Sequence, residues 1–307
     1  METRFDTIII GGGPAGYSAA LYAARAGLTA LVLEMLSPGG QMATTTQVDN
    51  YPGVGIGVDG YSLAESMQRD AEHFGAQSLF AEVTGMDLKS DPKTVTTSEG
   101  VFEAGTVILA TGASPKKLGI PEEETLVGRG VSYCATCDGM FYKGRTVAVL
   151  GGGNSAAADA LVLAKLCKKV YIVHRRDSLR AEASYMKPLG ETTNVEFVWN
   201  QAVDGLETGA NGVTGVKMTD KVTGEKKILP VDGVFVAIGR SPNTALLGGQ
   251  VELAPGGYIA AGEDTHTSQP GVFAAGDVRT KPLRQIVTAA ADGAVAATEA
   301  AAWLRSR

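Results

Sequence analysis

Short runs of β-branched and apolar residues alternate with helix-forming stretches along this chain. Residues 5–10 form such a run and predict a buried strand, and the alanine- and leucine-rich residues after Gly16 predict a helix that ends near Gly27. A second strand is predicted at residues 30–33. The same order returns with a strand at 146–150, a helix from about 156 to 166 and a strand at 170–173. This repeated βαβ pattern is typical of an α/β fold with parallel sheets.

The first strand ends in a glycine-rich turn. The turn contains Gly11, Gly13, Pro14, Ala15 and Gly16. Glycines at this spacing give a tight turn, let the backbone approach a pyrophosphate and allow close packing of helix on strand, while the helix N-terminus faces the anion. Glu34 follows 23 residues after Gly11, where a carboxylate can bind ribose hydroxyls. A plain βα turn is the alternative, but the combination favours a dinucleotide site.

A second glycine-rich turn follows the strand at 146–150. It contains Gly151, Gly153, Asn154, Ser155 and Ala156, where Ala156 replaces the third glycine. The position equivalent to Glu34 is His174, and Arg175, Arg176 and Arg180 come shortly after it. Guanidiniums bind a 2′-phosphate with paired hydrogen bonds, whereas a carboxylate repels it. The second site is therefore predicted to bind NADPH; a solvated basic loop is the alternative.

A module that holds NADPH needs a hydride acceptor, so the first module is predicted to bind FAD. A small polar stretch after Glu34 can follow the ligand towards its flavin end. A buried strand at 107–110 closes the module, and an aspartate after a late apolar strand can bind polyol hydroxyls unless it only caps a helix. The residues predicted to contact FAD in these segments are Gly39, Gly40, Gln41, Thr111, Gly112, Gly276 and Asp277.

The order of these signals predicts how the domains are connected. The FAD signals occupy residues 1–113 and 244–307, and the NADPH signals occupy residues 114–243. The fold is therefore predicted to be α/β, with two Rossmann-like dinucleotide-binding domains, the second inserted into the first. Pro115 and Pro242 mark the crossings near 113–117 and 240–244 as linkers. Two such connections can act as a hinge.

A Cys-x-x-Cys loop lies in the inserted domain, at Cys134 and Cys137. Two thiols at this spacing can close into a disulfide ring that stores two electrons. A zinc site or a structural disulfide are alternatives, but Cys167 and the three histidines stand at no metal-ligand spacing, so no metal is predicted. When a reduced flavin passes electrons to the disulfide, the departing thiolate needs a proton. Asp138 can supply it if burial raises its pKa, or it can simply form a turn with Gly139.

Composition narrows the class of protein. The 307 residues suit two domains, with 44% hydrophobic and 20% charged residues. A net charge of -6 argues against a surface for nucleic acid or anionic membranes. The sequence shows no signal-peptide pattern and no apolar run of membrane-spanning length, and three cysteines do not make a secreted disulfide framework. A cytoplasmic protein is expected.

These motifs together resemble the low-molecular-weight thioredoxin reductases of bacteria. The resemblance spans nearly the whole chain in the family's order and is most specific in the Cys-Ala-Thr-Cys-Asp-Gly loop. It implies a homodimeric FAD enzyme that reduces thioredoxin with NADPH, in which the NADPH domain rotates so that the dithiol meets the flavin and the substrate in turn. It also implies that Asp138 is the general acid and that Asn50, Arg284, Gln285 and Ile286 approach FAD.

The predicted function is therefore that of an NADPH-dependent thioredoxin-disulfide reductase. Electrons would pass from NADPH through FAD and the Cys134–Cys137 pair to the disulfide of thioredoxin. A related enzyme acting on a glutaredoxin-like protein or a small dithiol is an alternative, as is a redox-sensing flavoprotein without turnover. A ferredoxin-driven relative would lack the basic pair Arg175 and Arg176.

Overall fold

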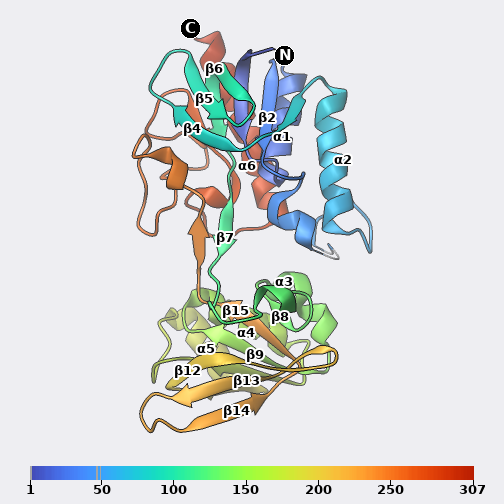
Figure 1. Cartoon of the computed structure of the whole chain (residues 1–307), viewed down its shortest axis with the longest axis vertical. Helices are drawn as coiled ribbons and strands as arrows, with labels where there is room; N and C mark the ends of the chain where they lie inside the picture. The colour runs from blue at the N-terminus through green and yellow to red at the C-terminus, as the bar shows by residue number, and fades with distance from the viewer. Residues whose placement is uncertain (1, 46–47, 49) are drawn as a thin grey trace. The chain divides into compact units, whose positions relative to one another are not determined.

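The computed structural model describes residues 2–45, 48 and 50–307, which divide into two compact units. One unit comprises the chain up to Ser114 and from Ser241 onward, and the other comprises Pro115–Arg240. The chain crosses from one unit to the other in β7 (Ala113–Pro115) and returns in β16 (Arg240–Pro242), and these two short strands pair with each other (Figure 1). The inserted unit is therefore connected by two neighbouring segments.

The first unit is built on a seven-stranded sheet of order β3-β2-β1-β6-β5-β4, with β17 also paired to β6. Neighbours among β1, β2, β3, β6 and β17 run parallel, whereas β4 and β5 are antiparallel to their neighbours. The strands are β1 (Arg4–Ile10), β2 (Ala30–Glu34), β3 (Gln77–Phe80), β4 (Val83–Asp87), β5 (Lys93–Thr97), β6 (Gly100–Leu109) and β17 (Val272–Ala274). The helices are α1 (Pro14–Arg25), α2 (Gly60–His73) and α6 (Ile286–Arg305), with 3-10 turns η1 (Gly40–Thr44), η4 (Ala245–Leu247) and η5 (Gly276–Val278).

The side chains of β1 pack alternately into two hydrophobic cores, because successive side chains of a strand point to opposite faces of the sheet. Ile8 and Ile10 pack into one buried cluster, and Ile9 packs into another that is rich in alanines of α1 and α6. A Cβ on Gly293 of α6 would lie 2.1 Å from the carbonyl oxygen of Ala15. The small residues therefore bring α6 directly onto α1, which holds the helix that follows the first glycine turn.

The second unit has a five-stranded parallel sheet of order β11-β10-β9-β15-β8 and a separate antiparallel sheet of order β12-β13-β14. The parallel strands are β8 (Val131–Ser132), β9 (Thr146–Gly151), β10 (Lys169–Val173), β11 (Val195–Val198) and β15 (Gly233–Ala237). The antiparallel strands are β12 (Gln201–Gly209), β13 (Gly212–Asp220) and β14 (Lys226–Pro230). The helices are α3 (Ala135–Asp138), α4 (Asn154–Ala164) and α5 (Ala183–Glu191), with 3-10 turns η2 (Glu124–Leu126) and η3 (Gly139–Tyr142).

Strand β9 divides its side chains in the same way as β1. Val147 and Val149 pack with residues of α4, whereas Ala148 and Leu150 pack with residues of β12 and β13. The parallel sheet is thus covered by helices on one face and by the antiparallel sheet on the other (Figure 1). Neither layer accounts for the ends of the parallel strands, where the glycine turn after β9 lies, and a ligand can bind there.

The predicted α/β fold with two Rossmann-like units is confirmed, and the differences are local. Helix α4 begins at Asn154, two residues earlier than predicted, because the extended Gly153 serves as its N-cap. Strand β6 starts at Gly100, so it is longer than the predicted strand, which covered only its apolar C-terminal part. Among the described residues, no helix has the combined length and apolarity that crossing a membrane requires.

Candidate active site

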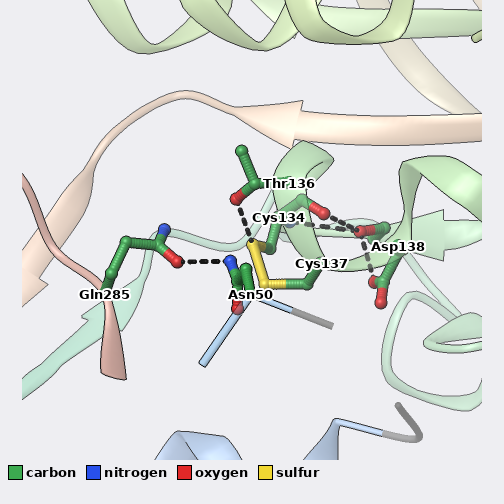
Figure 2. The surroundings of a disulfide bond; sticks show 7 residues. Asn50, Cys134, Thr136, Cys137, Asp138 and Gln285 are labelled. Carbon is green, nitrogen blue, oxygen red and sulfur yellow. Dashed lines mark hydrogen bonds between the residues drawn. A yellow bond between two sulfur atoms is a disulfide. The ribbon is translucent and has the colours of Figure 1, made fainter. Parts of the chain in front are cut away.

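Cys134 and Cys137 form a disulfide with their Cα atoms 5.3 Å apart. Cys134 is the N-cap of the one-turn helix α3, and Cys137 lies inside that helix, which brings the two sulfurs to the same side. The hydroxyl of Thr136 lies 3.4 Å from the Cys134 sulfur, and Figure 2 shows it beside the disulfide. Both cysteines are partly exposed, so the disulfide can be reached from outside this unit.

Asp138 ends α3 directly after the second cysteine. Its carboxylate accepts a hydrogen bond of 2.6 Å from the buried hydroxyl of Ser132, and the same hydroxyl oxygen accepts the Cys134 backbone N–H at 3.1 Å. Burial raises the pKa of Asp138, and the Ser132 hydrogen bond opposes part of that rise. Asp138 is the last residue of α3 and directly precedes η3, so it lies where the chain turns from one short helical segment into the next. An acid with a raised pKa therefore stands beside the disulfide.

The first glycine turn has the geometry of a pyrophosphate cradle. Gly11 has φ +106°, and a Cβ on Gly16 would lie 1.8 Å from the Gly11 carbonyl oxygen, so both positions require glycine. Gly13 faces open space, since the nearest atom to a Cβ there would be 3.9 Å away. Pro14 and Ala15 begin α1, whose N-cap Gly13 offers no side chain to its amides. The free N–H groups at this helix end suit an anion.

Glu34 lies at the end of β2 next to this turn. Its carboxylate accepts hydrogen bonds from the backbone N–H of Gly12 at 2.7 Å and of Met35 at 2.8 Å. Gly39, with φ +106°, donates its N–H to the Gly12 carbonyl at 2.7 Å, so the Gly39–Gly40 turn lies against the first turn. The Gln41 amide bonds the Ala113 carbonyl. These predicted FAD residues therefore form one cluster, and a dinucleotide fits its shape and donors.

The remaining residues predicted to contact FAD lie at other loop ends of the same unit. Thr111 donates its hydroxyl to the Asn243 carbonyl at 2.8 Å, and Gly112 has φ +69°. Asn50 donates to the side chain of Gln285, the N-cap of α6, at 2.9 Å (Figure 2). The other residues of this group are Gly276 and Asp277 in η5, Arg284, whose guanidinium lies 4.1 Å from the Tyr258 ring centre, and Ile286, the first residue of α6.

A buried charge cluster supports the Gly276 turn and was missed from the sequence. Asp292 on α6 accepts the Gly276 backbone N–H at 2.8 Å, pairs with the buried Arg279 through two bonds of 2.8 Å, and binds Lys281 at 2.6 Å. Despite its burial, the pKa of Asp292 is lowered by these partners. A single carboxylate thus fixes the turn that presents Asp277, although no residue of the cluster belongs to the glycine motifs.

The second glycine turn places its anion-binding residues together. Gly153 faces open space at the N-terminus of α4, where Asn154 and Ser155 form the first turn and the buried Ala156 packs against Gly151. The reciprocal hydrogen bonds between Asn154 and Glu182, of 2.8 and 2.9 Å, tie this helix end to the loop that carries Arg180. Glu182 was not predicted, since 28 residues separate it from its partner.

His174 lies directly beneath this turn. Its ring would stand 2.2 Å from a Cβ on Gly152, and among the described residues its buried Nε2 atom has no hydrogen-bond partner. Burial and the guanidiniums of Arg180, Arg175 and Arg176 lower the pKa of His174. The three arginines are exposed, and the Arg180 backbone N–H bonds the Gly152 carbonyl at 2.6 Å. An orphaned polar atom, an open glycine and free guanidiniums fit a phosphorylated nucleotide.

The site contains no alternative metal chemistry within the part of the chain that the structure describes, because no three His, Cys, Asp or Glu side chains gather to bind an ion. Cys167 is buried in the core of the second unit, and burial raises its pKa to about 11. It is therefore a packed, unreactive thiol.

A disulfide beside an acid and two dinucleotide turns define a class of redox enzyme, and comparison with known families agrees. The family model of the pyridine nucleotide-disulphide oxidoreductases matches residues 5–293. This chain belongs to that family.

Proteins of similar sequence and structure include several thioredoxin reductases. One from Treponema pallidum is 43% identical over 99% of this chain and 98% of its own length. A bifunctional thioredoxin reductase/thioredoxin of Mycobacterium leprae is 46% identical over 99% of this chain, which spans 66% of that longer protein. The crystal structure of thioredoxin reductase from Streptococcus pyogenes matches with a TM-score of 0.90 at 40% identity, with both chains covered fully.

These matches confirm the predicted kinship with bacterial-type thioredoxin reductases, flavoproteins that use FAD and NADPH. The predicted activity is the one that these relatives' names state. The individual cofactor contacts and the domain boundaries stay predictions.

Proposed function

We propose that this protein is an NADPH-dependent thioredoxin-disulfide reductase. The observation that carries the proposal is the partly exposed Cys134–Cys137 disulfide beside Asp138, in a chain with two glycine turns that differ at the ribose position. The net reaction joins NADPH, a proton and oxidised thioredoxin to give NADP⁺ and thioredoxin dithiol. Two electrons and two protons thereby reach the substrate, and atoms and charge balance.

Each unit holds one cofactor in this proposal. Residues 1–113 and 244–307 form the FAD domain, with the turn at Gly11, Glu34 and the Asp277 loop as principal contacts. Residues 114–243 form the NADPH domain, where Arg175 and Arg176 bind the 2′-phosphate. When bound, FAD supplies an acceptor for the hydride of NADPH and a donor of two electrons to the disulfide. The role of the protein in this proposal is to bind and orient the two nucleotides, one in each unit.

The residues of the α3 loop handle the protons and the disulfide exchange. When the Cys134–Cys137 bond breaks, one sulfur leaves as a thiolate, and the Asp138 carboxyl donates a proton to it. The raised pKa keeps this carboxyl protonated at higher pH than a solvent-exposed aspartate. In the second half of the cycle a thiolate of the pair attacks the thioredoxin disulfide, forms a mixed disulfide, and the other thiol resolves it.

A docking surface for a protein substrate adjoins the disulfide in the same unit. Met140 and Phe141 of η3 expose 53% and 49% of their surface directly after the redox loop, so two consecutive large apolar side chains are accessible there. Such side chains can anchor a thioredoxin that presents its own disulfide among apolar residues. A small dithiol would gain little from this surface.

We further propose a homodimer that works in the cytoplasm. A groove of about 670 Å³ lies on the first unit and is lined by Tyr22, Tyr51, Val54, Met67 and Val287, among others. A second copy can cover these apolar side chains, and sedimentation of the purified protein tests for it. A cytoplasmic site agrees with a dithiol that must be kept reduced by NADPH, and cell fractionation tests it.

The decisive experiment records the visible spectrum of the purified protein before and after anaerobic NADPH, followed by oxidised thioredoxin. We expect a flavin spectrum that NADPH bleaches and that thioredoxin restores, with steady NADPH consumption when thioredoxin is in excess. Oxidised glutaredoxin and a small disulfide serve as comparison substrates. A protein that bleaches once but turns over with none of them would contradict the proposal, and turnover with the small disulfide alone would assign a different substrate.

A further inference from the structure

One buried carboxylate outside every glycine and cysteine motif is bonded to the segment that carries the redox disulfide. The side chain of Glu123 belongs to a residue that is 3% exposed, and its Oε1 atom accepts a hydrogen bond of 2.6 Å from the Tyr133 hydroxyl. The same carboxylate accepts the backbone N–H groups of Leu118 and Gly119, each at 2.9 Å. It therefore makes three hydrogen bonds, which is what a buried carboxylate requires.

Tyr133 is the residue immediately before Cys134. Strand β8 ends at Ser132, the chain bends at Tyr133, and Cys134 is extended before α3 begins. Ser132 bonds the Cys134 backbone N–H and the Asp138 carboxylate, and Tyr133 bonds Glu123. Two consecutive residues before the disulfide are thus each fastened by a hydroxyl-to-carboxylate bond.

The far end of this connection is also fixed. Leu118 and Gly119 follow within four residues of Pro115, where the chain enters this unit. Glu123 itself precedes η2, whose Leu126 is buried in the core beside the parallel sheet. The carboxylate consequently ties the entering segment, η2 and the redox loop to one point.

We propose that Glu123, acting through the Tyr133 hydroxyl, is a positioning residue of the redox site that stabilises the Cys134–Cys137 disulfide relative to the open dithiol. The proposal rests on the redox role given above for this pair. An intramolecular disulfide is favoured by the effective concentration of one thiol near the other, which falls when their segment is free to move. Tyr133 restrains that segment at its start, one residue from the first sulfur.

The chemistry of the bond argues for positioning over mere packing. An apolar pair would fill the same space without the cost of burying a charge. A hydroxyl bonded to a fixed carboxylate instead sets both the direction and the depth of the tyrosine ring, because such bonds are short and directional. The ring in turn fixes the backbone from which Cys134 leaves.

The test uses Tyr133→Phe and Glu123→Gln in the FAD-loaded protein, with Glu124→Gln as the matched control. Glu124 is adjacent in sequence, but its side chain is 75% exposed and its partner is the surface residue Lys117. Each protein is equilibrated with mixtures of reduced and oxidised dithiothreitol, and the free thiols are trapped and counted by mass. In this exchange dithiothreitol closes to its cyclic disulfide while the Cys134–Cys137 bond opens and gains two protons. The flavin absorbance, recorded in parallel, counts electrons held elsewhere.

We expect Tyr133→Phe to shift the equilibrium towards the dithiol by about three- to tenfold, the scale of the net contribution of one hydrogen bond, and Glu123→Gln to shift it in the same direction by a smaller factor. The double variant should shift the equilibrium about as far as Tyr133→Phe alone, because Glu123 acts on the loop through the Tyr133 hydroxyl, whereas Glu123→Gln alone leaves an amide oxygen that still accepts that hydroxyl. The Glu124→Gln protein should match wild type, and NADPH should bleach the flavin equally in all proteins, which shows that the fold is intact.

An equilibrium within twofold of wild type in Tyr133→Phe, or a shift towards the disulfide, would overturn the proposal. Tyr133→Phe keeps the ring and decides the matter even if Glu123→Gln folds poorly. The measurement needs no thioredoxin. A wild-type protein that fails to reduce thioredoxin would therefore refute the proposed function, while the dithiothreitol equilibrium would still test the positioning role.

Discussion

Removal of the Ser132 hydroxyl tests how the acid beside the disulfide is tuned. In the structure the hydroxyl bonds the Asp138 carboxylate at 2.6 Å and so favours the charged form against burial, which raises the pKa of Asp138. A hydrogen bond to a charged group contributes about 1.5–3 kcal/mol, and because Asp138 is only partly buried we take the lower end. Ser132→Ala should therefore strengthen proton binding by that carboxylate about tenfold.

The direction in which the pH profile of kcat shifts follows from the role of Asp138 as a general acid. A general acid is active when protonated, so turnover falls as pH rises through the pKa of Asp138. Without the Ser132 bond the pKa rises further, and the high-pH fall in kcat for thioredoxin should move to higher pH. Asp138→Asn should remove this fall and lower kcat by about 10²- to 10⁴-fold, the usual contribution of general acid catalysis.

The assay is the pH profile of kcat with saturating NADPH and thioredoxin. Ser62→Ala is the matched control, because Ser62 donates an equally short bond of 2.6 Å to Asp59, a half-buried aspartate remote in sequence from the redox loop. Its profile should overlay that of wild type. If the Ser132→Ala profile also overlays wild type, or moves to lower pH, then the bond does not tune the acid and the assignment of Asp138 fails.

Three further outcomes follow from the same geometry. Cys137→Ser should leave a yellow protein that NADPH still bleaches but that reduces no disulfide, and retained turnover would contradict the redox role of the pair. Changing both Arg175 and Arg176 to Ala should raise KM for NADPH far more than for NADH, because in the proposed function these guanidiniums bind the 2′-phosphate that NADH lacks; equal losses would refute that assignment. Gly293→Ala should lower the free energy of unfolding by about 1–3 kcal/mol, since its methyl would meet the Ala15 carbonyl 2.1 Å away, and an unchanged melting temperature would refute the close contact.

The sequence predicted those features whose signal is local. A glycine that needs positive φ, a β-branched run before it and a polar residue at the next strand end, Glu34 or His174, all fall within one βαβ unit, so their spacing alone located the turns at Gly11 and Gly151. The disulfide was equally local, because its cysteines share one helical turn. The start of α4 was misplaced by two residues because helix boundaries depend on the cap, and Gly153 serves as a cap without a side chain.

Residues that support the site through long-range contacts gave no such signal. Asp292 reaches the Gly276 turn across 16 residues, and Glu182 reaches Asn154 across 28. Glu182 is an acidic residue in a polar stretch and Asp292 is an acidic residue in an alanine-rich helix, and a charge on a helix or loop normally indicates a solvated face. Only the fold shows that Asp292 points inward towards Arg279, where a lone charge would be costly.

Ser132 marks the boundary between these two cases. It lies two residues before Cys134, and a serine hydroxyl often bonds a backbone N–H two residues on, so its contact with the Cys134 N–H was within reach of the sequence. Its bond to Asp138 was not, because that bond requires α3 to fold the chain back over β8. The motif thus fixes which atoms react, while neighbouring residues such as Ser132 and Tyr133 set the proton affinity and the position of those atoms. Relatives that share the cysteines can therefore differ in redox behaviour through these neighbours, and substitutions there should alter the chemistry without removing it.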